Sequence, residues 1–141
     1  MSGLSLEILT PAKLAYSGSV KAVTVPGTAG SFQVLFNHAP IISTLEIGAV
    51  KLELEDKSVL YFASGGGTIE VANNKVRILV DSLESVNDID LQRAKRALER
   101  AQARLANKSN EAIDVARAET ALARANNRIK FVEKYYTQKV N

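Results

Sequence analysis

Cysteine and tryptophan are absent from this sequence of 141 residues, and histidine occurs once. The lack of cysteine excludes disulfides, thiolate metal sites and a cysteine nucleophile, and a single histidine disfavours any histidine-rich metal site. No apolar run reaches the ~20 residues of a membrane-spanning helix, and residues 1–20 lack the basic and apolar pattern of a secretory signal. We therefore expect a chain that begins near Met1, holds no metal and works in the cytosol or a matrix-like compartment.

Glycine and proline are missing from the second half of the chain, since all eight glycines and all three prolines lie within the first 67 residues. The charges divide as well. Residues 1–87 hold 6 Lys/Arg against 8 Asp/Glu, and residues 88–141 hold 12 against 7, which gives −2 and +5 and sums to the overall +3. This composition predicts two domains, 1–87 and 88–141, of which the second is the part that meets anions.

Several short runs in the first domain alternate apolar with polar residues, as at 4–8, 50–54 and 76–80. A period of two predicts strands with one buried face. No helical pattern of crossover length separates these runs, so we expect antiparallel hairpins that build an all-β sandwich or flattened barrel. Further strands are expected at 20–25, 32–34, 59–63 and 68–71.

The hydrophobic period changes after residue 90. Apolar residues then recur every three or four positions over 91–105 and again over 115–136, on either side of a polar break at 107–110. This spacing predicts two α-helices, the first capped by Asp88 and the second by Ser109 or Asn110. The connection is short, so we expect an antiparallel α-helical hairpin.

Alanine supplies about half of the inward positions of this hairpin, such as Ala94, Ala101 and Ala118. A buried methylene contributes only about 0.8 kcal/mol, so an alanine layer stabilises the helix pair much less than a leucine layer does. We hypothesise that the hairpin is a movable element. The alternative is a stable, alanine-rich coiled coil.

Two features that suggest chemistry have simpler explanations. His38 has no titratable partner nearby in the sequence and precedes Pro40 in an expected loop, so we assign it structural hydrogen bonding instead of general-base catalysis. The run Ser64–Thr68 contains three glycines, but it lacks the Gly-Lys-Ser/Thr ending of a phosphate loop and leads into no expected helix. We expect a bend at a strand edge there, and no catalytic residues in the chain.

The arginines of the second domain are segregated from its lysines. When heptad positions are assigned to both expected helices, six of the seven arginines after residue 88 fall on one flank of the hairpin. Arg93 of the first helix is then expected to lie opposite Arg124 of the second. Guanidinium groups grip phosphate oxygens bidentately, which favours a phosphate-bearing ligand. The alternative is a solvated or protein-facing flank with surface salt bridges to Asp90 and Asp114. The flank consists of Arg93, Arg100, Arg104, Arg117, Arg124 and Arg128.

Taken in order, several motifs resemble the epsilon-subunit family of rotary F-type ATP synthases, of the bacterial or plastid type, over nearly the whole chain. Two positions depart from the family pattern: Phe36 stands where proline is usual, and Gly67 where a large apolar residue commonly follows the glycine pair. The matching stretches are Gly30 through His38-Ala39-Pro40-Ile41-Ile42, Leu45-x-x-Gly48, Ser64-Gly65-Gly66 with Ile69-Glu70-Val71, Val76-x-Ile78-Leu79-Val80-Asp81, and Ile89-Asp90-Leu91-Gln92-Arg93-Ala94.

The resemblance implies a non-catalytic, regulatory subunit of the central stalk of a proton-translocating enzyme. The sandwich is expected to bind the gamma subunit and the c-ring, and the hairpin to contact beta subunits and inhibit ATP hydrolysis. The isolated chain is expected to be a monomer. In the complex it is peripheral to the membrane, on the cytoplasmic face of the bacterial plasma membrane or, alternatively, the stromal face of the thylakoid. The alternative hypothesis is a basic adaptor protein that binds nucleic acid. It is disfavoured because the first helix has no aromatic residue on which a base could stack.

Some members of the resembled family hold ATP in the closed hairpin, and the resemblance carries this role over residue by residue. It places Asp90 and Glu84 towards adenine and ribose, and arginines around the phosphates. No cofactor is required; ATP is expected as a regulatory ligand that favours the closed form, so that falling ATP releases the inhibitory form. The implied ATP-binding residues are Glu84, Ile89, Asp90, Arg93, Ala94, Arg100, Arg124 and Arg128.

Overall fold

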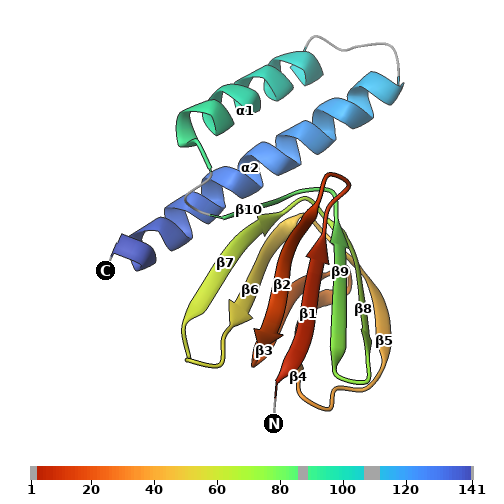
Figure 1. Ribbon diagram of the computed structural model, residues 1–141. Helices are drawn as coiled ribbons and strands as arrows, with labels where there is room; N and C mark the ends of the chain where they lie inside the picture. Colours follow the sequence, from red (N-terminus) through yellow and green to blue (C-terminus); the bar gives the residue numbers. More distant parts are fainter. Residues whose placement is uncertain (1–2, 86–88, 107–111, 141) are drawn as a thin grey trace. The chain divides into compact units, whose positions relative to one another are not determined.

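The computed structural model describes residues 3–85, 89–106 and 112–140, except for the side chains of 112–114 and 135–140. The chain divides into two compact units, Met1–Ser85 and Val86–Asn141, where the sequence predicts 1–87 and 88–141. Unit 1 is built from strands and unit 2 from two helices (Figure 1). Neither of the helices in the described ranges combines the length and apolar character that a membrane crossing requires.

The strands of unit 1 form one curled sheet in the order β10-β7-β6-β3-β5-β8-β9-β1-β2, with β4 paired to β3 (Figure 1). The sheet folds over so that its two halves face each other, which confirms the predicted all-β sandwich or flattened barrel. The strands are β1 (Leu4–Leu9), β2 (Leu14–Val20), β3 (Ala22–Gly27), β4 (Gly30–Leu35), β5 (Ile41–Leu45), β6 (Gly48–Glu53), β7 (Val59–Ser64), β8 (Gly67–Ala72), β9 (Lys75–Val80) and β10 (Leu83–Ser85).

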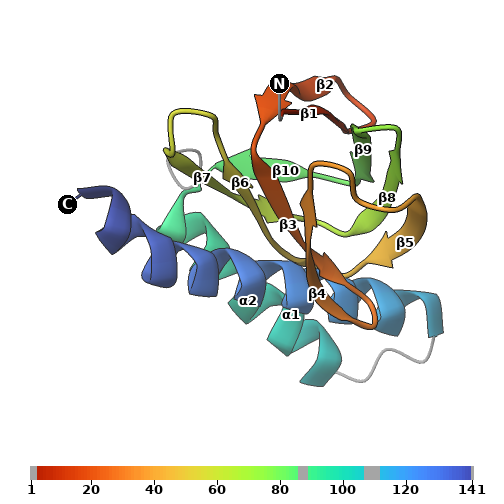
Figure 2. The same ribbon diagram turned by 90° about the horizontal axis from the view of Figure 1, so that it is seen from below.

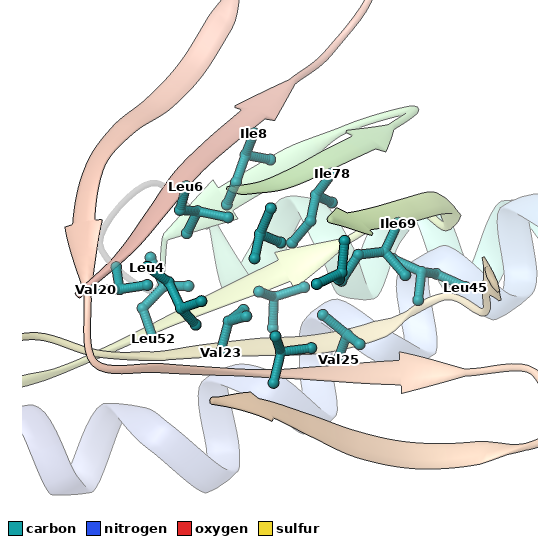
Figure 3. Close-up of a cluster of buried hydrophobic side chains, with 14 of the residues drawn as sticks. Leu4, Leu6, Ile8, Val20, Val23, Val25, Leu45, Leu52, Ile69 and Ile78 are labelled. Atoms are coloured by element: carbon teal, nitrogen blue, oxygen red, sulfur yellow. The ribbon is translucent and has the colours of Figure 1, made fainter. Parts of the chain in front are cut away.

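The core of the sandwich consists of leucine, isoleucine and valine side chains that point towards one another between the two halves of the sheet (Figure 3). Strand β9 shows how the sequence produces it: exposed and buried residues alternate without interruption from Lys75 to Val80. Each of these side chains contributes roughly 1.5–3 kcal/mol when fully buried. The sandwich therefore has a core of large, branched residues on which its stability rests.

One strand pair departs from the expected antiparallel hairpins. Strands β1 and β9 run parallel, from the pair Ser5 and Lys75 to the pair Leu9 and Leu79. Parallel neighbours need a long connection, usually a helix, but here all of the strands from β2 to β8 supply it. Pairing the first strand with a late one joins the two ends of the domain. The sheet is consequently mixed, and the prediction of a purely antiparallel sandwich was wrong on this point.

An asparagine pair ties two turns of the sandwich together. The Asn37 backbone N–H donates to Asn74 Oδ1 (2.6 Å), and Asn74 Nδ2 donates to Asn37 Oδ1 (3.2 Å). Both residues have positive φ, which asparagine tolerates better than most residues. His38, in the same loop, donates from Nδ1 to the Ala39 carbonyl oxygen (2.7 Å). This contact agrees with the structural role predicted for the histidine.

The glycine run joins β7 to β8 as a bend, as predicted, and not as a phosphate loop. Gly65 N–H donates to the Ser82 carbonyl oxygen, and Asp81 N–H donates to that of Gly66, both at 3.0 Å. Gly66 has a φ of 86°, a conformation that favours glycine. A Cβ at Gly67 would collide with the Leu79 carbonyl group. This close backbone approach explains the glycine where the resembled family commonly has a large apolar residue.

The turn between β6 and β7 contains a carboxylate, Asp56, whose pKa is shifted by hydrogen bonds. The hydroxyl group and the backbone N–H of Ser58 both donate hydrogen bonds to Asp56 Oδ1. These bonds lower the pKa of Asp56 below its ordinary value, and the bond from the hydroxyl group has the larger effect. Because the folded pKa is depressed, this carboxylate stabilises the fold above the unfolded pKa, and the contribution is lost as pH falls through the folded value. Ser58→Ala should raise the pKa of Asp56 in an NMR titration. An unchanged value would contradict the assigned cause.

Candidate functional site: an arginine flank on the helical hairpin

Helices α1 (Leu91–Ala106) and α2 (Ala112–Val140) lie side by side and run antiparallel (Figures 1 and 2), which confirms the predicted hairpin. Four alanines of the two helices are buried, each at most 3% exposed, and so are Phe131 and Val132 in α2 (2% and 9% exposed), whereas Leu91, Leu98 and Leu105 are only half-buried. The alanine positions of the seam are thus buried as predicted from the sequence, and the leucines between them add only partly buried surface. The four alanines are Ala94, Ala101, Ala118 and Ala125.

Asp90 occupies the N-cap position of α1. Its Oδ1 accepts from the Arg93 backbone N–H (3.1 Å), and its carbonyl oxygen accepts from the Ala94 N–H (3.0 Å). The first bond satisfies a donor that the first turn of a helix leaves open, and the second is the first regular hydrogen bond of the helix. Asp88, the cap predicted from the sequence, lies outside the described residues, as do Ser109 and Asn110.

Helix α1 carries a large excess of positive charge. It contains five cations, Arg93, Lys95, Arg96, Arg100 and Arg104, and a single carboxylate, Glu99. All five cations are exposed, and within the described ranges none of the α1 arginines has a carboxylate within 4 Å. Like charges spaced by four residues destabilise a helix by about 0.2–0.5 kcal/mol per pair. A bound anion would remove this repulsion.

The predicted salt bridges to Asp90 offer a competing explanation of the flank. The carboxylate of Asp90 caps the helix, and no ion pair to it forms among the described residues. The side chain of Asp114 lies outside the described part of the chain. The explanation based on Asp90 salt bridges is therefore weakened, while the general alternative of a solvated or protein-facing flank stays open.

A shallow groove of about 460 Å³ lies on α2, lined by Ala116, Arg117, Thr120, Ala121 and Arg124. The alanines leave room between two arginines that are seven residues, about 10 Å, apart along the helix axis. Guanidinium donors, a hydroxyl group and an apolar floor together suit a ligand with both phosphate and apolar parts. Sequence reasoning placed the arginines but missed Thr120 and Ala121, although their spacing puts them on the same helix face.

The other predicted site residues lie in different surroundings. Ile89 is half-buried just before α1, Ala94 is buried in the seam, Arg100 is exposed on α1, and Arg128 is half-buried on α2 with an interaction partner. Glu84 belongs to unit 1, where it lies opposite Ala63 in the pairing of β10 with β7. Unit 2 therefore contains the stretch Ile89–Ala94 and the predicted arginines, but not Glu84. The roles of all these residues towards ATP stay predictions.

Models of two protein families match successive parts of the chain. Residues 3–86 match the beta-sandwich domain of the ATP synthase delta/epsilon chain, and residues 87–133 match the long alpha-helix domain of the same chain. Together they cover both units. Their order along the sequence is the order of the sandwich and the hairpin in the structure.

Individual relatives agree with these matches. The chain is 41% identical to the ATP synthase epsilon chain of Desulforamulus reducens, over 91% of this chain and 96% of the relative. It is 46% identical to that of Nitratidesulfovibrio vulgaris, over 86% and 90%. A chain in the Euglena gracilis mitochondrial ATP synthase shares the fold with a TM-score of 0.77 at 22% identity, over 89% of this chain and 78% of that one. The protein therefore belongs to the delta/epsilon chain family of ATP synthases.

Proposed function

We propose that the chain is a non-catalytic central-stalk subunit that couples rotation through its sandwich and regulates ATP hydrolysis through its hairpin. The observation that supports this most is the match of both units, in order and over nearly the full length, to epsilon chains. The sandwich has a large branched core suited to a rigid coupling element, and the hairpin has an alanine seam suited to opening. The proposed partners are the gamma subunit, the c-ring and the beta subunits, at the cytoplasmic face of a bacterial membrane.

The hairpin is the proposed inhibitory element. Residues 88–141, which contain the hairpin, carry a formal net charge of +5. This charge favours attraction to an acidic surface on a beta subunit once the helices separate. Opening exposes four alanines together with leucines that are already half exposed, so it costs less than opening a seam of fully buried leucines would. The closed form shown here is then the non-inhibitory state, and the proportion of open chains sets the degree of inhibition.

Reconstitution tests this proposal directly. An ATP synthase head prepared without its own epsilon chain is mixed with the full-length chain, and ATP hydrolysis is measured at low and high ATP. We expect binding to the head together with gamma, and inhibition that is stronger at low ATP. Copurification with RNA or DNA instead would favour the nucleic-acid adaptor, and unaltered hydrolysis at both ATP concentrations would remove the regulatory role.

The arginine flank is the proposed nucleotide-sensing part, and arginine geometry makes it testable. Arg93→Lys combined with Arg124→Lys keeps both charges but removes the planar donors that bind phosphate bidentately. Charge-assisted hydrogen bonds contribute about 1.5–3 kcal/mol each, so ATP affinity measured by calorimetry should fall roughly tenfold or more. Arg96→Lys is the matched control, because the heptad pattern places Arg96 alone among the hairpin arginines off the flank. Equal affinity for the double variant and the control would contradict an arginine phosphate site.

A further inference from the structure

We propose that Asp90 acts as a positioning residue: by capping α1 it holds the hairpin closed, and it influences anion binding through the helix instead of touching the ligand. Its carboxylate is already engaged, since Oδ1 accepts from the Arg93 N–H at 3.1 Å. The part of this inference that concerns a ligand rests on the proposed nucleotide-sensing function. The part that concerns closure of the hairpin does not.

The positions around Asp90 are those of a complete helix start. With Asp90 as N-cap and Leu91 as the first helical residue, Ile89 falls at the position before the cap and Ala94 at the fourth helical position. These two positions are the ones that pack together in a hydrophobic staple. Ile89 is half-buried and Ala94 is 3% exposed. The residue that completes the helix start is thus also the first alanine of the seam, which links capping to closure.

The first turn of α1 depends unusually on this cap. It contains no acidic residue, and its third position is Arg93, a cation at the end of the helix where the backbone dipole is positive. Asp90 supplies the negative charge next to that turn, and an anion bound at Arg93 would supply a second one. Cap and anion then stabilise the same end of the same helix. Loss of the cap should lower the closed population, and an anion should restore part of it.

The test compares three substitutions in the full-length chain. Asp90→Asn and Asp90→Ser retain a good cap but lose the charge, whereas Asp90→Ala loses both. Gln92→Ala, an exposed change in the same first turn, is the control. Hydrogen exchange across residues 91–106 should accelerate about fivefold in Asp90→Ala, by a smaller factor in Asp90→Asn and Asp90→Ser, which lose the charge but keep the cap, and not measurably in Gln92→Ala. Equal acceleration in all three Asp90 variants, or in none, would overturn the capping role.

Calorimetric titration of the same proteins with ATP separates positioning from contact. We expect Asp90→Asn and Asp90→Ser to bind close to the native affinity, and Asp90→Ala to bind up to about fivefold more weakly. A tenfold loss in Asp90→Asn and Asp90→Ser with unchanged hydrogen exchange would show that the carboxylate contacts the ligand. If the native chain binds no ATP, the nucleotide-sensing proposal fails, and the order of exchange rates alone decides whether Asp90 holds the hairpin closed.

Discussion

Replacing Ala118 with glutamate is expected to open the helical hairpin and leave the sandwich folded. Ala118 is 1% exposed in the seam, so the new carboxylate would be buried without a partner, at a cost of roughly 3–5 kcal/mol. The four seam alanines together contribute only about 3 kcal/mol by methylene burial. The penalty matches or exceeds the contribution of the alanines, although Phe131 and Val132 are buried in α2 as well, so hydrogen exchange should show markedly reduced protection across residues 91–134. In a reconstituted head, the variant should inhibit ATP hydrolysis more strongly than the native chain does.

Ala123→Glu is the matched control for this experiment, because it introduces the same side chain at an exposed position of the same helix. It should change neither hydrogen exchange nor inhibition, since surface substitutions usually alter stability by less than about 0.5 kcal/mol. A hairpin that stays protected in Ala118→Glu would show that the seam is stronger than its alanines indicate. Loss of structure in the sandwich as well would show that the two units do not unfold separately.

The second large effect is expected in the core of the sandwich. Ile69 is fully buried at the centre of β8, among the side chains drawn in Figure 3. Ile69→Ala leaves a cavity and should destabilise the sandwich by about 2–5 kcal/mol. In a domain of this size that corresponds to a fall in melting temperature of roughly 10 °C or more, measured by calorimetry or circular dichroism.

Ile42→Ala removes the same atoms from the neighbouring strand, β5, where the side chain is 78% exposed. This control should shift the melting temperature by no more than a few degrees. The comparison holds residue type and strand structure constant and changes only burial. Similar losses for both variants would contradict the assignment of the core, and would mean that Ile42 is covered in solution.

Local patterns in the sequence predicted most of the sandwich and failed where pairing is distant. The alternation over 4–8, 50–54 and 76–80 marks strands because each side chain is buried or exposed by its own position. The parallel pairing of β1 with β9 joins residues about 70 positions apart, and no short window contains that information. Strand β2 was missed from residue 14 to 19 because its glycine and serines weaken the strand pattern.

In the candidate site too, local features could be predicted from the sequence, whereas features that depend on neighbouring side chains could not. Helix phase is a local property, so the heptad pattern predicts an arginine flank from the sequence alone, and the shared face of Arg117 and Arg124 on α2 agrees with it. The sequence does not decide which residue begins the helix, because aspartates at 88 and 90 both make good caps. In the structure, the bonds that the side chain and the carbonyl group of Asp90 accept identify it as the N-cap. The groove on α2 depends on the volumes of neighbouring side chains, so Thr120 and Ala121 emerged only with the structure.

The two units differ in what holds them together, and this difference underlies the proposed regulation. Large branched side chains fill the sandwich, whereas the buried residues of the hairpin are mostly alanines, and its first helix carries five cations and one carboxylate. A ligand shifts such an equilibrium only as far as it binds one state better than the other. If arginines of both helices bind one phosphate-bearing ligand, as we propose, closure of the hairpin provides that preference, because separating the helices moves Arg93 away from Arg124.

The most direct measurement is hydrogen exchange of the full-length chain with and without ATP, compared between α1, α2 and the core strands β8 and β9. We predict that residues 91–134 exchange much faster than the core strands without ATP, and that ATP slows exchange in the hairpin while leaving the strands unchanged. Hairpin protection equal to that of the core strands, with or without ATP, would contradict this prediction. The helices would then be permanently closed, and only the coupling role of the sandwich would remain.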